Sequence, residues 1–352
     1  MSIEGQEKRV GHHHGLAVAH LRSGDDTEAR AELQSALREA DRLYARISCE
    51  LGQVLQSQER YEKALAAFEG GLNRVPDEGV CLFESGVTLN RLGRHEEALE
   101  KLEQALEHDL DHAAVYHEIG RAYRTRGWYS EALHALQEGL NRDDERASLH
   151  RDTAAVLGAL GQQERAIDHL HKALDLLPHE GSSASLLQGK SRSRKNGRGN
   201  GGQAGAGTKE AAWRHELGGL YQEAGRVEEA ADVYREAISL EPAHPVYNHS
   251  LGSAIKELDQ HGEAVRYLRR AVELSPNQAT WHADLAEALR AMENWKLALR
   301  EYERAIEMDE EEAAYHYGAG QALYQLGEHA AAAEALERAK TLAPSHAATH
   351  HQ

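Results

Sequence analysis

Two dipeptides in the sequence begin like a zinc hydrolase motif, in which a second His one helical turn later completes the metal site. They are His117-Glu118 and His215-Glu216, but Arg121 or Gly219 stands where the second His is needed. The sequence also has no GxSxG nucleophile motif and no CxxC pair. We therefore expect no catalytic residue, no cofactor and no enzymatic activity.

Two glycine-rich stretches resemble phosphate-binding loops. Residues 184–191 (ASLLQGKS) match a relaxed phosphate-binding loop, and Gly197, Gly199 and Gly202 spell GxGxxG. Such loops need a strand before them and a helix after them, so that backbone N–H groups point at the phosphate. No such setting is predicted here, and we attribute both matches to composition.

A group of His residues near the N-terminus suggests a metal site, because neutral imidazoles are common metal ligands. It comprises His12, His13, His14 and His20. Adjacent side chains on a helix point in different directions, however, and no Cys or carboxylate completes a known ligand spacing. We expect no physiological metal site.

All these residues lie in a pattern of paired helices that repeats every 34 residues. In residues 211–244, apolar residues recur at helical spacing on both sides of Gly225, and Pro242 ends the second helix. The same frame begins seven more times, at Ala45, Gly79, Ala113, Ala147, Pro245, Ala279 and Ala313. Position 20 of the frame is Ala in all eight copies: Ala64, Ala98, Ala132, Ala166, Ala230, Ala264, Ala298 and Ala332. We expect two helices to cross closely at this Ala.

Position 8 of the frame is always Gly or Ala, and position 24 is always Phe, Tyr or Leu. With these small, aromatic and Pro positions the sequence resembles the tetratricopeptide repeat family, which has a 34-residue helix-turn-helix signature. The resemblance covers residues 45–346 apart from one insertion. It implies an all-α, right-handed superhelical solenoid, a scaffold that serves many unrelated partners.

The frame predicts how the chain is divided. A degenerate repeat over residues 1–44 is expected to cap the N-terminus, four repeats occupy 45–180, four more occupy 211–346, and 347–352 form a tail. Residues 181–210 are rich in Gly, Ser and basic residues, so we expect a flexible linker. A regulatory phosphorylation site at Ser191 or Ser193, or a basic segment that visits an acidic surface, is a further interpretation of this linker.

Composition limits the classes of partner. The formal net charge of −18 argues against general binding to nucleic acid or to anionic membranes. The sequence shows no N-terminal apolar signal segment and no run of about 18 apolar residues. Cys49 and Cys81 are too few for a disulfide framework, and we expect both thiols to be reduced. Together these features predict a cytoplasmic protein.

Binding is expected on the first helix of each repeat. Positions 2, 5, 6, 9 and 13 lie opposite the packed positions on a helical wheel, and the family resemblance implies that they line the concave groove. Position 6 is acidic in six of the eight copies: Glu50, Glu84, Glu118, Asp152, Glu216 and Asp284. Position 5 adds His117, His215, His249 and Arg151. Position 2 has few basic residues, which argues against a site that binds the C-terminal carboxylate of a partner. The His residues at position 4 are expected to be structural.

This acidic column has two interpretations. An acidic protein places carboxylates wherever a helix is exposed, and the helix dipole favours them in first turns. Alternatively, carboxylates in one column repel one another, and a bound cation relieves the repulsion. Packed helices lie about 8–10 Å apart, and an extended peptide rises roughly 3.3 Å per residue. Successive first helices would therefore contact every third residue of such a peptide. The second interpretation predicts an extended peptide with Lys or Arg at that spacing.

These features predict a non-catalytic scaffold or adaptor for a protein or peptide partner. One alternative is a recruiting subunit of a multi-protein enzyme complex, of the glycosyltransferase or hydroxylase type. Another is a His-rich metal-binding protein, and nucleic-acid binding through the linker comes last. The Ala-rich last helix has no polar capping helix after it, which suggests that it packs against a partner or a second copy of the chain.

Overall fold

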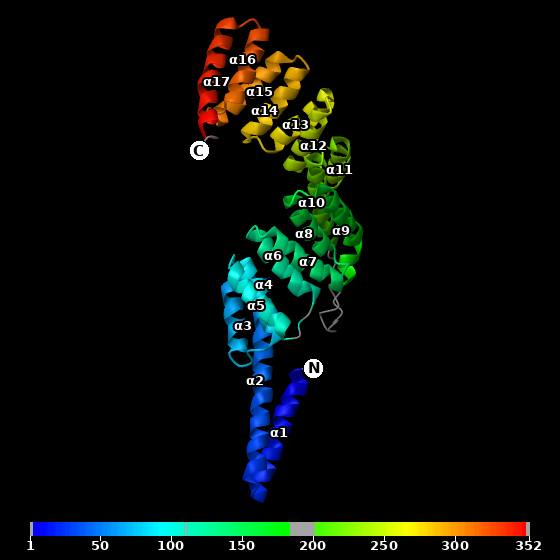
Figure 1. The fold of residues 1–352 in the computed structure, drawn as a ribbon, viewed down its shortest axis with the longest axis vertical. Coiled ribbons are helices and arrows are strands. Elements are labelled where there is room, and N and C mark those ends of the chain that lie inside the picture. Colours follow the sequence, from blue (N-terminus) through cyan, green and yellow to red (C-terminus); the bar gives the residue numbers. More distant parts are fainter. Residues whose placement is uncertain (1–2, 109, 111, 184–200, 350–352) are drawn as a thin grey trace. The chain divides into compact units, whose positions relative to one another are not determined.

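The computed structural model describes residues 3–108, 110, 112–183 and 201–349 (Figure 1). Within these residues the chain forms seventeen α-helices and no strand. The chain divides into two compact units, Met1–Leu160 and Gly161–Gln352, which we call unit 1 and unit 2. Each unit is a stack of antiparallel helix pairs, so the chain is an all-α solenoid, as predicted.

Unit 1 contains eight helices within the described residues. They are α1 (Ile3–Ser23), α2 (Asp26–Ser57), α3 (Tyr61–Leu72), α4 (Gly79–Arg91), α5 (His95–Glu107), α6 (Ala113–Thr125), α7 (Tyr129–Arg142) and α8 (Ala147–Ala159). Each helix packs against the next, and α2, α4, α6 and α8 also contact one another in that order. The first helices of the repeats therefore form one continuous face of the unit.

Unit 2 contains the remaining helices of the described chain. They are α9 (Gln163–Ser183), α10 (Gly201–Glu223), α11 (Val227–Leu240), α12 (Pro245–Glu257), α13 (His261–Leu274), α14 (Ala279–Ala291), α15 (Trp295–Met308), α16 (Ala313–Gln325) and α17 (His329–Thr349). Residues 184–200 of the predicted linker, with Ser191 and Ser193, lie outside the described residues. The two ends of that linker are helical, as the last turn of α9 and the first turns of α10.

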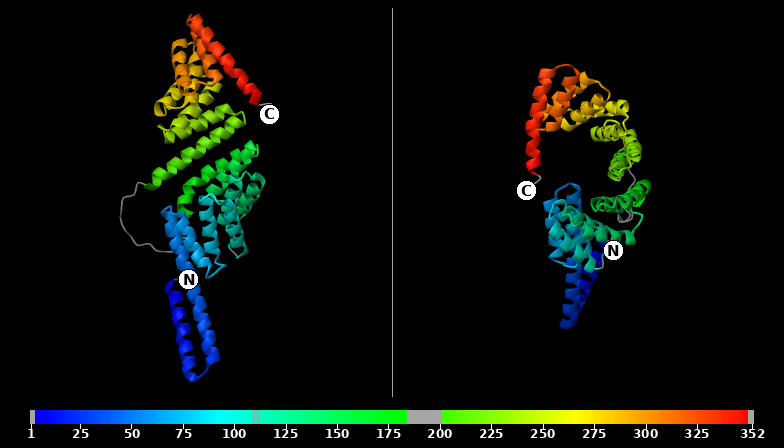
Figure 2. Two further views of the ribbon diagram at one scale, coloured as in Figure 1. Left: turned by 90° about the vertical axis from the view of Figure 1, so that its left-hand side faces the viewer. Right: turned by 45° about the horizontal axis from the view of Figure 1, so that its top comes forward.

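The hairpin of α1 and α2 departs from the repeat pattern. The frame places the start of a repeat at Ala45, but α2 runs without a turn from Asp26 to Ser57. No Gly or Pro occurs between residues 25 and 51 to interrupt the helix. α1 lies along the N-terminal half of α2, and α3 lies along its C-terminal half (Figures 1 and 2).

The turn inside each helix pair depends on one residue with a positive φ. In six turns it is a Gly with φ between 73° and 83°: Gly24, Gly93, Gly127, Gly161, Gly225 and Gly327. In three turns the same place is taken by Glu59, Asp259 and Glu293, each with φ 58°. For these three residues the left-handed conformation costs about 1–2 kcal/mol, a penalty that a Gly would avoid.

The small residues of the frame are where two helices cross. The prediction for position 20 is confirmed, since all eight Ala residues are buried and none is more than 2% exposed. At position 8, a Cβ added to Gly86 would lie 2.6 Å from Leu102 Cγ, and one added to Gly218 would lie 2.3 Å from Tyr234 Cε1. Gly86 and Gly218 are required to be Gly because the large side chain at position 24 fills the space that a Cβ would occupy.

One repeat makes this contact differently. It carries Ala286 at position 8, and the ring of Tyr302, its position 24, also lies over Gly318 of the next repeat. A Cβ on Gly318 would be only 2.3 Å from Tyr302 Cζ. Gly318 stands at position 6, so this ring explains why the last repeat has no carboxylate there.

Candidate interaction surfaces

The predicted acids of unit 1 lie on the face made by the first helices. Glu50 on α2 is exposed and pairs with Arg46 of its own helix, with 3.3 Å between Nε and Oε1. Glu84 on α4 is half-buried and accepts a hydrogen bond of 2.8 Å from Gln53 Nε2, one repeat earlier. These two carboxylates are the more accessible members of the column in this unit.

Glu118 on α6 is buried. Its Oε2 accepts a hydrogen bond of 3.2 Å from Asn90 Nδ2, and its Oε1 lies 2.9 Å from Arg121 Nη1. Asn90 Nδ2 also donates to the backbone oxygen of Glu118, at 3.0 Å. The carboxylate therefore connects α6 to α4 and is partly neutralised by an Arg of its own helix.

Asp152 on α8 is also buried. His117 Nε2 donates to its Oδ2 at 2.7 Å, and Arg151 Nη1 donates to its Oδ1 at 2.7 Å. Burial raises the pKa of Asp152, but the hydrogen bond from His117 and the charges of His117, Arg151 and Arg124 outweigh it, and the pKa is about 2. The structure thus brings three predicted site residues, His117, Arg151 and Asp152, into one ion-paired group.

In unit 2 the same face contains a second group of this kind. His249 Nε2 donates to Asp284 Oδ2 at 2.8 Å, and Lys256 Nζ lies 2.6 Å from Asp284 Oδ1. Burial raises the pKa of Asp284, but the hydrogen bonds from His249 and Lys256 lower it more. The His249 ring stacks on Trp281 with 4.8 Å between centroids. Asp284 is therefore held by His249 and Lys256, both on α12, the first helix of the preceding repeat.

The remaining predicted residues of unit 2 are His215 and Glu216, both half-buried on α10. His215 Nε2 lies 2.9 Å from Ser250 Oγ, and its ring lies 5.0 Å from the ring of Tyr247. Burial and the charge of His244 lower the pKa of His215. This His is placed to join α10 to α12.

A common register underlies these contacts. His at position 5 of one repeat reaches position 6 of the next, 35 residues later, in His117–Asp152, His215–Ser250 and His249–Asp284. The column is thus not a row of open carboxylates, because Glu84, Glu118, Asp152 and Asp284 all have partners within the chain. The peptide-binding role of these residues stays a prediction. The spacing of 35 between His and an acid was the sequence signal for the pairing.

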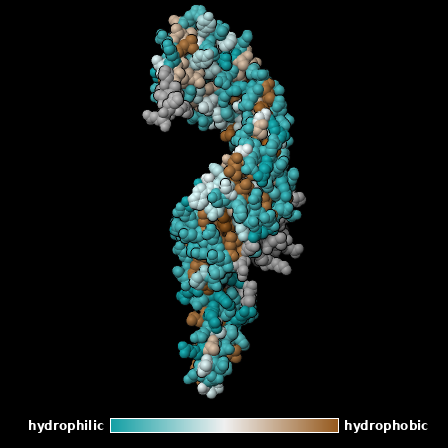
Figure 3. Space-filling model, viewed as in Figure 1, coloured by the Kyte–Doolittle hydropathy of each residue, from teal (hydrophilic) through white to brown (hydrophobic). Residues whose placement is uncertain are grey.

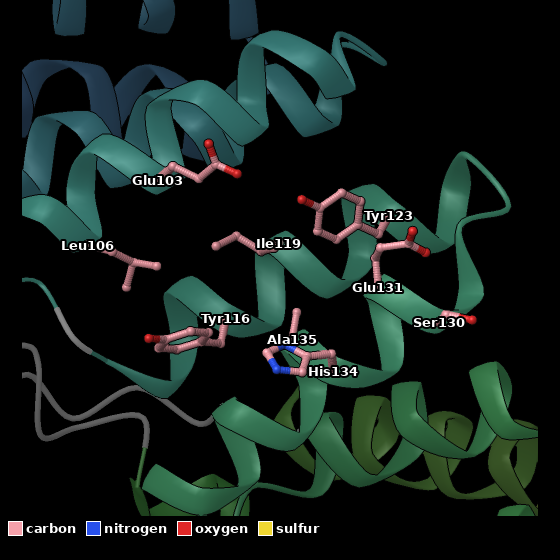
Figure 4. Close-up of a pocket in the computed structure, with 9 residues that line it drawn as sticks. All are labelled: Glu103, Leu106, Tyr116, Ile119, Tyr123, Ser130, Glu131, His134 and Ala135. Carbon is pink, nitrogen blue, oxygen red and sulfur yellow. The ribbon is translucent and has the colours of Figure 1, made fainter.

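A pocket in unit 1 was not found from the sequence. Figure 3 shows a mostly hydrophilic surface with hydrophobic residues grouped over α6 and α7. Here a cavity of about 460 Å³ lies between α5, α6 and α7 (Figure 4). It is lined by Glu103, Leu106, Tyr116, Ile119, Tyr123, Ser130, Glu131, His134 and Ala135. Sequence reasoning missed it because Tyr116, Ile119 and Tyr123 occupy frame positions assigned to packing.

The pocket combines an apolar floor with acidic walls. Ile119 and Ala135 are buried beneath it, whereas Glu103 on α5 and Glu131 on α7 are exposed, with Tyr123 of α6 between them (Figure 4). Burial raises the pKa of Tyr123, and the charges of Glu103 and Glu131 raise it further. No Lys, Arg or His in the described part of unit 1 forms an ion pair with either carboxylate. Such a site suits the apolar stem and charged end of a Lys or Arg side chain.

Two further properties bear on the alternatives. Among residues 3–108, 110, 112–183 and 201–349, no three His, Cys, Asp or Glu side chains gather in a metal-binding arrangement. Crossing a bilayer would need a longer run of apolar residues than any described helix provides.

Solved structures with the same kind of fold have low sequence identity to the chain. The C-terminal part of a tetratricopeptide repeat-containing protein from Cytophaga hutchinsonii has a TM-score of 0.55 and 15% identity, over 76% of this chain and 98% of that one. PilF from Pseudomonas aeruginosa has a TM-score of 0.50 and 13% identity, over 67% and 94%. YrrB, a tetratricopeptide repeat protein with an unusual peptide-binding site, has a TM-score of 0.47 and 22% identity, over 61% and 95%.

A search of curated proteins found no sequence match. Models of the tetratricopeptide repeat, however, match residues 39–111, 113–146, 214–244, 246–278 and 283–347. These matches cover more than half of the chain and follow the helix pairs of both units. The chain therefore belongs to the tetratricopeptide repeat family.

Proposed function

We propose that the protein is a non-catalytic adaptor that binds an extended, basic segment of another protein. Tetratricopeptide repeats are protein-interaction scaffolds, and their stacked helices offer long surfaces to such segments. The observation that carries the proposal is the pocket of unit 1, where Glu103 and Glu131 both lie near Tyr123 at the edge of an apolar floor. A Lys or Arg side chain would place its methylene groups on Ile119 and its charge near the two carboxylates and the Tyr123 ring.

The first-helix face is the second binding surface of this proposal. Glu50 and Glu84 are its accessible carboxylates, and a basic peptide would meet them at the spacing expected from the sequence. Glu118 and Asp152 already bind Arg121, Arg151 and His117, so a ligand cation would have to displace these partners. We therefore rank the pocket above the face as the anchoring site.

The experiment uses a fluorescent peptide with Lys at every third residue and measures its binding by anisotropy at low and high salt. We expect Glu103→Gln/Glu131→Gln to weaken binding at least tenfold, which corresponds to about 1.4 kcal/mol. The matched control is Glu62→Gln/Glu100→Gln, which removes the same charge from exposed positions on α3 and α5. The control should bind within about twofold of the wild type, because distant exposed charges are screened by salt.

A third variant, Glu50→Gln/Glu84→Gln, tests the first-helix face. If it weakens binding and the pocket variant does not, the anchoring site is the face rather than the pocket. If the wild type does not bind the Lys peptide at low salt, or if all three variants lose affinity equally, the proposal of a basic ligand fails.

Association through the C-terminal helix stays a separate prediction. α17 is the second helix of the repeat that begins at Ala313, and within the described residues no further repeat packs on it. At frame positions 21 and 28, where other repeats carry apolar residues that meet the next repeat, α17 has Ala333 and Lys340, both exposed. Lys340 gives this face some of the polar character of a capping helix.

A further inference from the structure

An exposed apolar stripe runs along α2. Its residues recur at alternating spacings of four and three, the a and d pattern of a coiled coil. They are Leu33, Leu37, Ala40, Tyr44, Ile47, Leu51 and Val54, which we call the α2 stripe. Six of the seven are large, and each of these six is between 43% and 61% exposed. Three heptads of exposed apolar side chains on one helix indicate a contact that the single chain does not make.

The fold explains why this stripe is open. In the repeat that begins at Ala113, frame positions 3, 7 and 10 are the buried Val115, Ile119 and Ala122, because α5 of the preceding repeat packs on them. In the first full repeat the same positions are Ile47, Leu51 and Val54, and they are 47–53% exposed. Since α2 continues straight through residue 45, no second helix folds back to cover them.

We propose that the α2 stripe is covered by the α2 stripe of a second copy of the chain, in an antiparallel pair around a two-fold axis. A stripe that repeats every 3.5 residues packs along its whole length on a helix with the same repeat, and a second copy supplies one. A two-fold pair is also the commonest form of homo-oligomer, because one self-complementary surface closes the assembly.

The sizes of the side chains favour the antiparallel direction. With the axis near residue 42, Ala40 of one copy meets Tyr44 of the other, Leu37 meets Ile47, and Leu33 meets Leu51. The smallest residue of the stripe therefore faces its largest. In a parallel pair Ala40 would face Ala40 and leave a gap, while two Tyr44 rings would face each other.

Neighbouring charges allow the same arrangement. In an antiparallel pair, residues on one side of the stripe meet residues on the same side of the partner's stripe, so Gln34 of one copy lies near Ser48 of the other, Ala36 near Glu50, and Leu43 near Leu43. The two Asp41 side chains meet across the axis, and the charge of each is offset by Arg74 of its own chain, with 3.2 Å between Nη1 and Oδ1. Arg74 lies 5.4 Å from the centroid of the Tyr44 ring and leaves that side chain half exposed.

The size of the contact sets its strength. The six large side chains together bury on the order of 1,000 Å² when two copies pair, which is the lower limit for a specific interface. The dimer is therefore reversible and depends on protein concentration. α17 offers less apolar area to a second copy, because Lys340 is exposed on its outer face.

Sedimentation equilibrium of the full chain over a range of concentrations tests the proposal. We expect the mass of the wild type to rise from one chain towards two, and Leu37→Lys/Leu51→Lys to stay at one. Lys lowers the net negative charge, so loss of the dimer could not come from added overall repulsion. Circular dichroism checks that the variants keep their helix content and cooperative melting.

Two single variants serve as controls. Met292→Lys changes a side chain that is 50% exposed outside the stripe and should dimerise like the wild type. Ala333→Lys tests α17. If it alone abolishes association, the contact lies at the C-terminal helix and the proposal is wrong. The proposal also fails if the wild type is monomeric throughout or if the stripe variant dimerises normally.

A cross-linking experiment tests the direction. Chains with Ala40→Cys and chains with Tyr44→Cys are oxidised with glutathione disulfide, separately and as a mixture. The native Cys49 and Cys81 are buried and should not react. The antiparallel pair predicts a disulfide dimer mainly in the mixture, whereas cross-linking of each variant with itself would show a parallel pair.

Discussion

His117 binds a carboxylate that lies one whole repeat further along the chain, with its Nε2 2.7 Å from Asp152 Oδ2. Both side chains are largely buried, 13% and 7% exposed. His249 and Asp284 repeat the relationship at the same spacing of 35 residues in unit 2. Neighbouring repeats are thus joined by directed hydrogen bonds as well as by apolar contact, and this fixes the register in which their first helices pack.

Removing the charge of Asp152 should destabilise the fold. We expect Asp152→Asn to lower the free energy of unfolding by about 1–3 kcal/mol, because His117 and Arg151 lose their ionised acceptor. Urea titration measures the change. The control is Glu50→Gln, whose pair with Arg46 is exposed and should contribute less than about 1 kcal/mol. Equal effects of the two variants would mean that the buried pair has no special role.

The same pair predicts how stability depends on pH. The pKa of Asp152 is about 2 in the folded chain and lies below the ordinary value of 3.8. The stabilisation is therefore complete above about pH 4 and is lost as the pH falls through about 2. Wild type and Asp152→Asn should approach each other in stability over this window. Parallel curves for the two proteins would contradict the assignment.

His282 should be structural, as predicted for His at position 4. It is 2% exposed, its Nε2 bonds Pro276 O at 3.1 Å and its Nδ1 bonds Glu301 Oε2 at 2.7 Å. We expect His282→Ala to lower the free energy of unfolding by about 2–3 kcal/mol, since buried acceptors lose their partner. Urea unfolding followed by circular dichroism measures it.

A conservative variant separates the two contacts of His282. Asn248 holds the same frame position one repeat earlier and donates to Pro242 O at 3.2 Å. His282→Asn should therefore keep the loop contact and recover part of the stability lost in His282→Ala. If Asn and Ala are equally destabilising, the contact with Glu301 carries the effect instead.

Gly318 should not tolerate a side chain. A Cβ would lie 2.3 Å from Tyr302 Cζ, so Gly318→Ala is expected to destabilise by about 1–3 kcal/mol through overpacking. A double-mutant cycle with Tyr302→Leu should recover much of this loss. Gly219→Ala is the matched control, because there the nearest atom, Tyr234 Oη, would be 4.0 Å away. That change should be neutral or stabilising, by up to about 1 kcal/mol.

The turn at Glu293 offers a stabilising substitution. Its φ of 58° is left-handed, and the equivalent residue of the next repeat is Gly327. We expect Glu293→Gly to raise the free energy of unfolding by about 1 kcal/mol, the conformational penalty it removes. Gly327→Ala should lower stability by a similar amount. Thermal unfolding of both variants checks the pair, and a destabilising Glu293→Gly would contradict the conformational explanation.

The helix pairs could be predicted from the sequence because each repeat contains the residues that define its two helices and the turn between them. The Gly of the turn, the Ala at position 20 and the small residue at position 8 all depend on contacts within one repeat. The straight course of α2 was missed. The 34-residue frame places a repeat boundary at residue 45 from spacing alone, although residues 25–51 contain no helix breaker. The exposed stripe of α2 was hidden for the same reason.

The site was harder to predict than the fold. A helical wheel places Glu118 and Asp152 on one face, but it does not show that Asn90 and His117 of the preceding repeat reach them. Those contacts depend on how consecutive repeats stack. The pocket at Glu103 and Glu131 likewise needs three helices at once, α5, α6 and α7, and no single helix of the sequence reveals it.

The unbroken α2 also has a mechanical consequence. At 1.5 Å per residue its 32 residues make a rod of about 48 Å. One end carries α1 and the other end is the first helix of a full repeat, with no hinge between them. A molecule that binds the α1–α2 hairpin therefore also fixes the orientation of the repeats of unit 1, because one rigid helix belongs to both.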